Sequence, residues 1–203
     1  HGGNHGDYGV IEILRESRKE LPYLELVHRL DRETSGVLLI SKSRPILQEL
    51  HHLLREGHQM EKHYVALVHG IWKQGKQTLT HQLQRQANRT QKVQVSAQGK
   101  ASTSIFTPLQ HFDASTLMDV QIITGRMHQI RTQLAYLNHP IIGDTMYGDQ
   151  KVNKRFQKEY QHSRLFLHAR HINFRLDGIQ KSYALKAPLP PMLIQLVEQL
   201  SAH

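Results

Sequence analysis

The stretch HRLDRETSG, from His28 to Gly36, concentrates two arginines, two acids, a histidine and two hydroxyl side chains within nine residues. Apolar runs typical of strands flank it, at 24–27 and 37–40. A dense polar loop between two buried strands is typical of a functional site on a rigid scaffold. The alternative is an ordinary charged loop that is merely solvated.

The charge balance of the chain points to a polyanionic partner. Among 203 residues, 26 are lysine or arginine and 17 are aspartate or glutamate, which gives a net charge of +9. RNA, DNA and anionic lipid all fit this excess, but a membrane is less favoured because no apolar run is long enough to span one. Cysteine is absent, which excludes disulfides and fits a reducing, cytoplasmic compartment.

The hydrophobic pattern predicts an α+β fold with a mostly antiparallel sheet. Apolar spacing predicts helices from Val10 to before Pro22 and at 44–56, 125–137 and 192–200, and strands at 64–72, 102–108, 116–123, 172–176 and 180–185. Short strands can pass through the polar, basic segment 73–100, but its composition is more typical of a mobile loop facing RNA. Because the helices sit between hairpins rather than alternating with strands, antiparallel pairing in a single domain, 1–203, is expected.

Asp31 is the candidate catalytic residue of the first stretch. In an extended loop, residues two apart face the same way, so Arg29 and Asp31 can share one side. An aspartate near guanidinium groups stays ionised at neutral pH, which is the state that a nucleophile or an electrostatic stabiliser needs. The competing interpretation is a structural Arg–Asp pair that braces the loop.

The stretch TGRMHQIR, 124–131, carries a second group of candidates. If a helix begins near Gly125, His128 and Arg131 lie on one face of it. Arg126 then falls in the first turn, where the helix dipole gives no reason for a cation, so it indicates an anionic partner. Alternatively, Arg131 is a surface helix residue without a partner.

The remaining patterns carry less specific signals. Tyr64, at the start of a predicted strand, can stack on a base or accept a proton, or can simply be half-buried in the sheet. Sixteen histidines raise the question of a metal, but adjacent His51 and His52 do not share a helix face and no carboxylate completes a ligand set. No Gly-rich phosphate loop is present, so neither a metal nor a nucleotide cofactor is predicted.

Five motifs together resemble one family. In chain order they are HRLDRETSG, KHYVALVHG, TGRMHQIR, HPIIGDTMYGD and RLFLHA. With this order and spacing the chain resembles the RluA family of RNA pseudouridine synthases over essentially its whole length. The resemblance implies a mixed, mostly antiparallel bent β-sheet with a central cleft and flanking helices, and an isomerase that needs no cofactor.

The resemblance also implies roles for single residues. Asp31 matches the catalytic aspartate, Arg131 the arginine that pairs with it, and Tyr64 the tyrosine that packs on the target base. The remaining expected RNA- or base-binding residues are Arg29, which helps to displace the base, Leu167, which closes the pocket, and His28, Arg126 and His128. Departures from the family pattern at Met127, Thr132 and Gln133 bear on substrate choice rather than on activity.

The segments HGG…YGVIE and LELVHRLDRETSGVLLISK are most similar to family members that act on large-subunit ribosomal RNA. They imply 23S ribosomal RNA as substrate and partner of a monomeric enzyme. The first methionine is Met60, and family members often carry an N-terminal S4-type RNA-binding domain. The chain is therefore expected to be a fragment, the catalytic domain without that module.

Isomerising uridine requires the base to be flipped into a pocket and its glycosidic bond to be broken. An ionised Asp31 can attack either the ribose C1′ or uracil C6, and both attacks need an aspartate in the same place. Two other function classes remain open: a non-catalytic RNA-binding or ribosome-assembly module on the same fold, and a metal hydrolase. The first would bind RNA without forming pseudouridine, and chelators would abolish the activity of the second.

Overall fold

The computed structural model describes residues 9–56, 59–86 and 92–202. The helices within these ranges are α1 (Val10–Ser17), α2 (Arg44–Glu56), α3 (Gln129–Tyr136), α4 (Gln150–Tyr160), α5 (Pro191–Ser201) and the short 3-10 helix η1 (Asp177–Ile179). None of them combines the length and the apolar composition that crossing a membrane requires.

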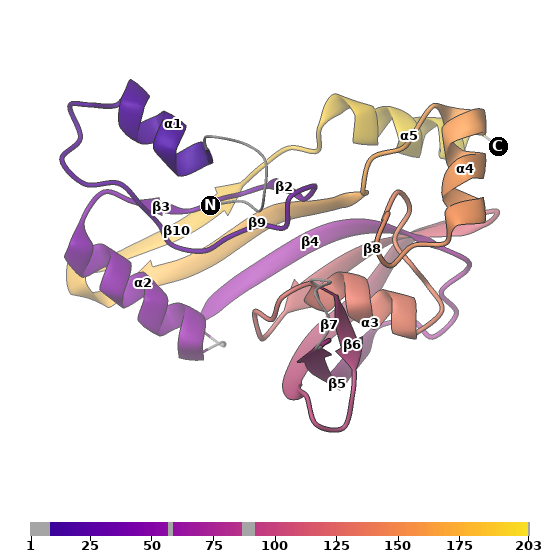
Figure 1. Cartoon of the computed structure of the whole chain (residues 1–203), viewed down its shortest axis with the longest axis horizontal. Helices are drawn as coiled ribbons and strands as arrows, with labels where there is room; N and C mark the ends of the chain where they lie inside the picture. Colours follow the sequence, from indigo (N-terminus) through magenta and orange to yellow (C-terminus); the bar gives the residue numbers. More distant parts are fainter. Residues whose placement is uncertain (1–8, 57–58, 87–91, 203) are drawn as a thin grey trace.

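Most strands belong to one eight-stranded sheet (Figure 1). Its order is β10 (Lys181–Lys186), β9 (Leu167–Leu176), β4 (Met60–His69), β8 (Ser115–Ile122), β7 (Lys100–Phe112), β5 (Gln77–Arg85) and β6 (Val93–Val95), all antiparallel. The eighth strand, β2 (Ser35–Gly36), pairs in parallel with β9. A separate antiparallel pair joins β1 (Glu25–Leu26) to β3 (Ile40–Ser41). The predicted α+β class with a mixed, mostly antiparallel sheet is confirmed.

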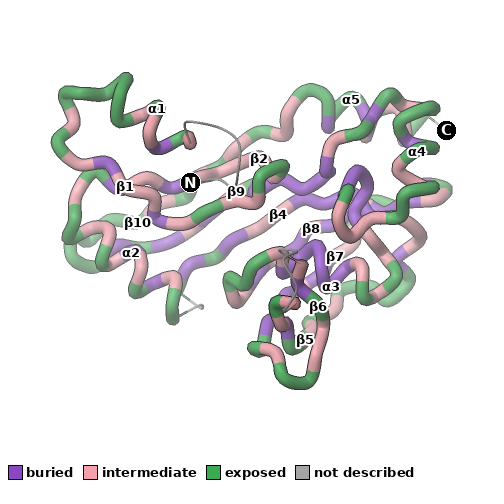
Figure 2. The backbone as a smooth tube through the Cα atoms, viewed as in Figure 1, coloured by how far each residue is buried: buried purple, intermediate pink, exposed green. Residues whose placement is uncertain are grey.

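Strand β4 lies in the middle of this sheet. Its residues 65–68 are all buried, so side chains that point to opposite faces are both covered. A strand covered on both faces has a continuous apolar run rather than a strict alternation, and Val-Ala-Leu-Val fits that expectation. Figure 2 shows the burial continuing along β4, β8 and β9.

The apolar side chains form two cores. The larger one includes Phe106 on β7, Leu134 on α3, Phe156 on α4 and Leu193 on α5. The smaller one gathers residues from the start of the chain, from α2 and from strands β4 and β9, namely Val27, Leu39, Leu50, Leu53, Met60, Ile172, Phe174 and Leu176. Because Val27 and Leu39 flank the HRLDRETSG stretch, the smaller core holds both of its ends.

The prediction of a mobile loop over 73–100 is wrong for the described part of that segment. Strands β5 and β6 and the first residue of β7 occupy it and extend the sheet. Most side chains of β5 are polar and only Leu83 is buried, so apolar alternation is weak there. The residues 87–91 lie outside the described ranges.

Helix α4 was not predicted from the sequence. Its apolar side chains are only Val152, Phe156 and Tyr160, spaced four apart along an otherwise polar segment. The signal that marks it is Asp149, whose carboxylate accepts hydrogen bonds from the backbone N–H groups of Lys151 and Val152. That arrangement is an N-cap and starts the helix.

Candidate active site

The loop that carries Asp31 is fastened to the main sheet through β2. Gly36 has a φ of +116°, and a Cβ at this position would lie 2.1 Å from the carbonyl oxygen of Ala169. Only glycine permits this approach of the two backbones. The backbone N–H of Val37 then donates to the same carbonyl at 2.9 Å. The glycine that ends the HRLDRETSG motif therefore fixes the loop against β9.

His168 provides a second attachment for the loop. Its Nε2 lies 3.1 Å from the carbonyl oxygen of Ala187, which can only accept, so Nε2 carries the proton. Nδ1 is then an acceptor and receives the hydroxyl of Ser35 at 2.9 Å. Burial lowers the pKa of His168, which keeps the ring neutral. The apolar RLFLHA motif thus contributes a buried polar attachment as well as core residues.

Helix α3 presents Arg131 from the opposite side. Two buried glutamines anchor the helix to β7: the Gln133 Nε2 donates to the Ser102 carbonyl at 2.8 Å, and the Gln129 Nε2 donates to the Thr103 carbonyl at 3.0 Å. Buried amides with satisfied hydrogen bonds hold one position rather than several. Gln133, one of the departures from the family pattern, therefore has a structural role here.

The prediction that this helix begins near Gly125 is wrong, because α3 begins at Gln129. His128 precedes it in the left-handed conformation, with φ of +52°, and the preceding residues form a turn. The two predicted side chains nevertheless converge on the same carboxyl group. Arg131 Nη1 donates to Asp31 Oδ2 at 3.2 Å, and His128 Nε2 lies 3.9 Å from Asp31 Oδ1.

Arg131 is held mainly by a different carboxylate, Asp144. Its Nε and Nη2 donate to the two oxygens of Asp144 at 2.8 and 2.9 Å, a bidentate pair with no solvent-exposed surface on the Asp144 side chain. Burial lowers the pKa of Arg131, but the hydrogen bonds and charge of Asp144 together with Asp31 outweigh it, so the pKa is raised. The guanidinium is a fixed positive charge.

This arrangement distinguishes between the two interpretations of Asp31, a catalytic carboxylate and one half of a structural Arg–Asp pair. The structural Arg–Asp pair is Arg131–Asp144, whereas Asp31 receives one longer hydrogen bond and its side chain is 24% exposed. Arg29 is exposed and makes no hydrogen bond to Asp31 among the described residues. The carboxylate of Asp31 is therefore charge-stabilised by Arg131 and still accessible, as an attacking group must be.

The protonation of His128 follows from its hydrogen bonds. The Tyr147 hydroxyl accepts the backbone N–H of Val93 at 2.8 Å and lies 2.8 Å from His128 Nδ1. Burial raises the pKa of Tyr147, so the hydroxyl stays protonated and donates a hydrogen bond to Nδ1. Burial also lowers the pKa of His128. A neutral ring that accepts at Nδ1 carries its proton on Nε2, which faces Asp31.

Tyr64 reaches the same region from β4. The pairing of β4 with β9 shifts register between His63 and Tyr64, because Arg170 is an extra residue on β9 at this point. Bulges of this kind are common beside functional sites. Burial, and secondly the charge of Asp31, raise the pKa of Tyr64 to about 12. The phenol is therefore protonated at neutral pH. To act as a base it would first have to lose its proton, which both burial and the charge of Asp31 oppose.

The other predicted residues have varied surroundings. His28 Nε2 accepts the backbone N–H of Leu39 at 3.1 Å, and burial lowers its pKa to about 4, so it is a neutral brace within the loop. Arg29 and Arg126 are exposed. Leu167 is 3% exposed and pairs with Ala66 on β4, within the larger core.

The motif HPIIGDTMYGD contains Asp144 and Tyr147, two residues of this site whose roles were not predicted from the sequence. The sequence signal for Asp144 is an acidic residue directly after a glycine within a family motif. Gly143 has a φ of +78°, and a Cβ there would lie 1.9 Å from the carbonyl of Arg164, so it places Asp144. A cavity of about 410 Å³ borders Tyr147 and Asp149; it lies beside the Asp31 group and does not include it.

Known proteins resemble this chain in sequence over most of its length. The family model described as RNA pseudouridylate synthase matches residues 6–136. Ribosomal large subunit pseudouridine synthase C of Buchnera aphidicola subsp. Baizongia pistaciae (strain Bp) is 42% identical, over 93% of this chain and 60% of that protein. The protein of the same name from Escherichia coli (strain K12) is 39% identical, over 98% of this chain and 63% of its own length. The chain thus spans less than two thirds of these relatives.

Solved structures share the fold. The structure of Human RNA Pseudouridylate Synthase Domain Containing 1 superposes with a TM-score of 0.75 at 25% identity, covering 98% of this chain and 89% of that one. Human RNA Pseudouridylate Synthase Domain Containing 4 gives a TM-score of 0.77 at 22% identity, covering 97% and 85%. The predicted bent-sheet architecture is confirmed by these likenesses.

Proposed function

Because the chain belongs to the RNA pseudouridylate synthase family, we propose that it isomerises specific uridines of 23S ribosomal RNA to pseudouridine. The names of its relatives, which specify the ribosomal large subunit, support this substrate. The net charge of +9 supports a polyanionic one. We further propose that residues 1–203 act as a monomeric catalytic domain in the cytoplasm.

The observation that carries the proposal is the accessible carboxylate of Asp31 beside the fixed charge of Arg131. The guanidinium positions this carboxylate through the hydrogen bond between them. That carboxylate adds to ribose C1′ or to uracil C6 of the flipped nucleotide. The glycosidic bond breaks, the uracil turns, and C5 bonds to ribose C1′ in place of N1. The bond to Asp31 is then broken again, C5 loses its proton and N1 takes one up, so the reaction is an isomerisation.

The surrounding residues have separate tasks in this proposal. Tyr64 packs against the uracil, and its protonated hydroxyl donates a hydrogen bond. The exposed Arg29 enters the space that the flipped base leaves, and Arg126 contacts phosphate. His128 directs its Nε2 proton towards Asp31 and orients the carboxylate. Flipping a base requires a few kcal/mol, roughly, which these contacts offset.

The variant Asp31→Asn tests this function. It keeps the size of the side chain and removes the attacking charge, so pseudouridine formation in large-subunit RNA is expected to fall at least about a thousand-fold. RNA affinity is expected to change little. Asp113→Asn, at an exposed turn between β7 and β8, is the matched control and keeps full activity.

Mapping pseudouridines in 23S RNA with and without the protein identifies the sites. Normal pseudouridine formation by Asp31→Asn contradicts the assignment of the aspartate. Salt-dependent RNA binding by the unaltered protein with no new pseudouridine would indicate a non-catalytic module instead.

A further inference from the structure

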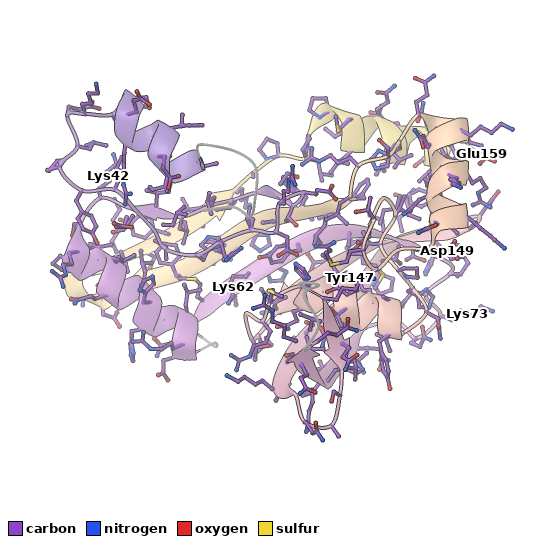
Figure 3. The ribbon with its side chains drawn as sticks, viewed as in Figure 1. Lys42, Lys62, Lys73, Tyr147, Asp149 and Glu159 are labelled. Carbon is purple, nitrogen blue, oxygen red and sulfur yellow. The ribbon has the colours of Figure 1, made fainter. Side chains whose placement is uncertain are left out.

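Lys62 is a buried lysine to which the proposed chemistry gives no task. It is 5% exposed and lies on β4, two residues before Tyr64. Its neighbours in the sheet are Ile122 on β8 and Ile172 on β9. Figure 3 labels it near the end of β4 that follows α2. The register with β8 is unbroken from Lys62 to Tyr64, so the two side chains point to the same face.

The ammonium group of Lys62 has no partner in the described part of the chain. No carboxylate lies within salt-bridge distance of it, and it makes no side-chain hydrogen bond among those residues. The carbon chain of Lys62 is covered and its ammonium has lost part of its hydration, which is unfavourable for a charge without a counter-charge. Burial accordingly lowers the pKa of Lys62. No contact among the described residues explains a cation in this position.

The position of Nζ supplies that explanation. A Cβ built on Gly125 would lie 4.0 Å from Lys62 Nζ, and the positive charge of Lys62 contributes to the lowered pKa of His28. The ammonium therefore lies where the HRLDRETSG loop meets the TGRMHQIR turn. Gly125 and Arg126 are exposed. Because Gly125 has no side chain, an anion can approach Nζ from the surface.

We propose that Lys62 binds a phosphodiester of the RNA, adjacent to the nucleotide whose base packs on Tyr64. This inference rests on the proposed function. It adds a contact that fixes the position of the RNA strand along the site. Residues two apart on a strand are separated by roughly 7 Å. Since the ribose separates a phosphate from its base, a base on Tyr64 brings a neighbouring phosphate within reach of the flexible lysine.

A phosphate suits this position better than a carbonyl oxygen of the base. The desolvated ammonium lacks a counter-charge, and an anion supplies one whereas a neutral carbonyl does not. The exposed arginines Arg29 and Arg126 belong to the same two loops, so the approach to Nζ is lined with cations. A polyanion entering there meets increasing positive potential.

The salt dependence of RNA binding tests the proposal. Affinities of a single-stranded RNA from the large subunit are measured by titration at several salt concentrations for the unaltered protein, Lys62→Met and Lys158→Met. The slope of log K against log [salt] is negative, and loss of one phosphate contact reduces its magnitude by about 0.7. We expect that change in Lys62→Met alone. Lys158 is the control because it is exposed on α4, which lies far from the start of β4 in Figure 1.

A second measurement locates the phosphate. Single methylphosphonate linkages, which remove the charge of one phosphate, are placed in turn around the target uridine. One linkage is expected to weaken binding to the unaltered protein about tenfold and to have no effect on Lys62→Met. An unchanged salt slope, or a linkage effect that persists in Lys62→Met, would overturn the proposal.

Thermal unfolding guards against misfolding of the variant, since methionine fills the same space without the charge and Lys62→Met is expected to be at least as stable. Binding, not turnover, is measured. An absence of pseudouridine would therefore refute the proposed function and leave this result intact.

Discussion

At the scale of single residues, Tyr147 determines which nitrogen of His128 carries the proton. The hydroxyl accepts from Val93 and donates to His128 Nδ1. Without it, Nδ1 can take up the proton and the ring loses its donor towards Asp31. Neither of these hydrogen bonds joins Tyr147 to Asp31 or to a proposed substrate atom. The tyrosine therefore acts through His128, as a positioning residue.

The variant Tyr147→Phe is therefore expected to lower kcat/KM about tenfold, which corresponds to about 1.4 kcal/mol, the scale of one hydrogen bond. The nitrogen chemical shifts of the His128 ring, measured by NMR, should change from the Nε2-protonated pattern to a mixture. A purely structural role would lower stability without moving those shifts. Tyr160→Phe is the control, because Tyr160 packs on Phe156 in the larger core away from the Asp31 group.

At the scale of elements, the attachment of β2 to β9 determines where Asp31 lies. Gly36→Ala introduces a Cβ 2.1 Å from a backbone carbonyl at a φ of +116°, so the strand pair must separate. We expect pseudouridine formation to be lost and urea unfolding to show a destabilisation of roughly 3 kcal/mol or more.

Gly75→Ala is the matched control for that variant. Gly75 also has a positive φ, +64°, but no atom lies within 4 Å of the added Cβ. Its expected loss is about 1 kcal/mol, from backbone strain alone. Equal effects of the two substitutions would show that strain, rather than the contact between β2 and β9, limits Gly36.

Elements with strong local patterns were predictable from the sequence. Helix α2 spans the predicted 44–56 because a complete apolar stripe defines it. Strands β5 and β6 and helix α4 lack such a stripe, and their stability comes from the pairings and packing around them. The family motifs predicted that Arg131 pairs with Asp31, and the structure joins these two residues, 100 apart in sequence, by a hydrogen bond. The bidentate hold of Asp144 on Arg131 depends on that tertiary arrangement and was not foreseen.

At the scale of the whole molecule, the neutral buried histidines make stability depend on pH. His28, His162 and His168 all have pKa values lowered by burial. Each binds its proton more weakly in the folded chain than in the unfolded chain, whose histidines titrate near pH 6.5, approximately. The stabilisation is therefore complete above that pH and is lost as the pH falls through the folded value. The net charge of +9 increases as histidines protonate, which adds repulsion.

His28 permits the clearest test, since its pKa is lowered to about 4. From pH 7 to pH 5 it should account for a loss of about 2 kcal/mol in the free energy of unfolding, measured with urea. His28→Gln keeps an acceptor for the Leu39 N–H but cannot titrate, so its loss over the same interval should be smaller by about that amount. His52→Gln, at an exposed position on α2, should behave like the unaltered protein. If His28→Gln loses as much stability in acid as the unaltered chain, then the ring is not held neutral in the fold. The brace between the two ends of the Asp31 loop would then not depend on its protonation.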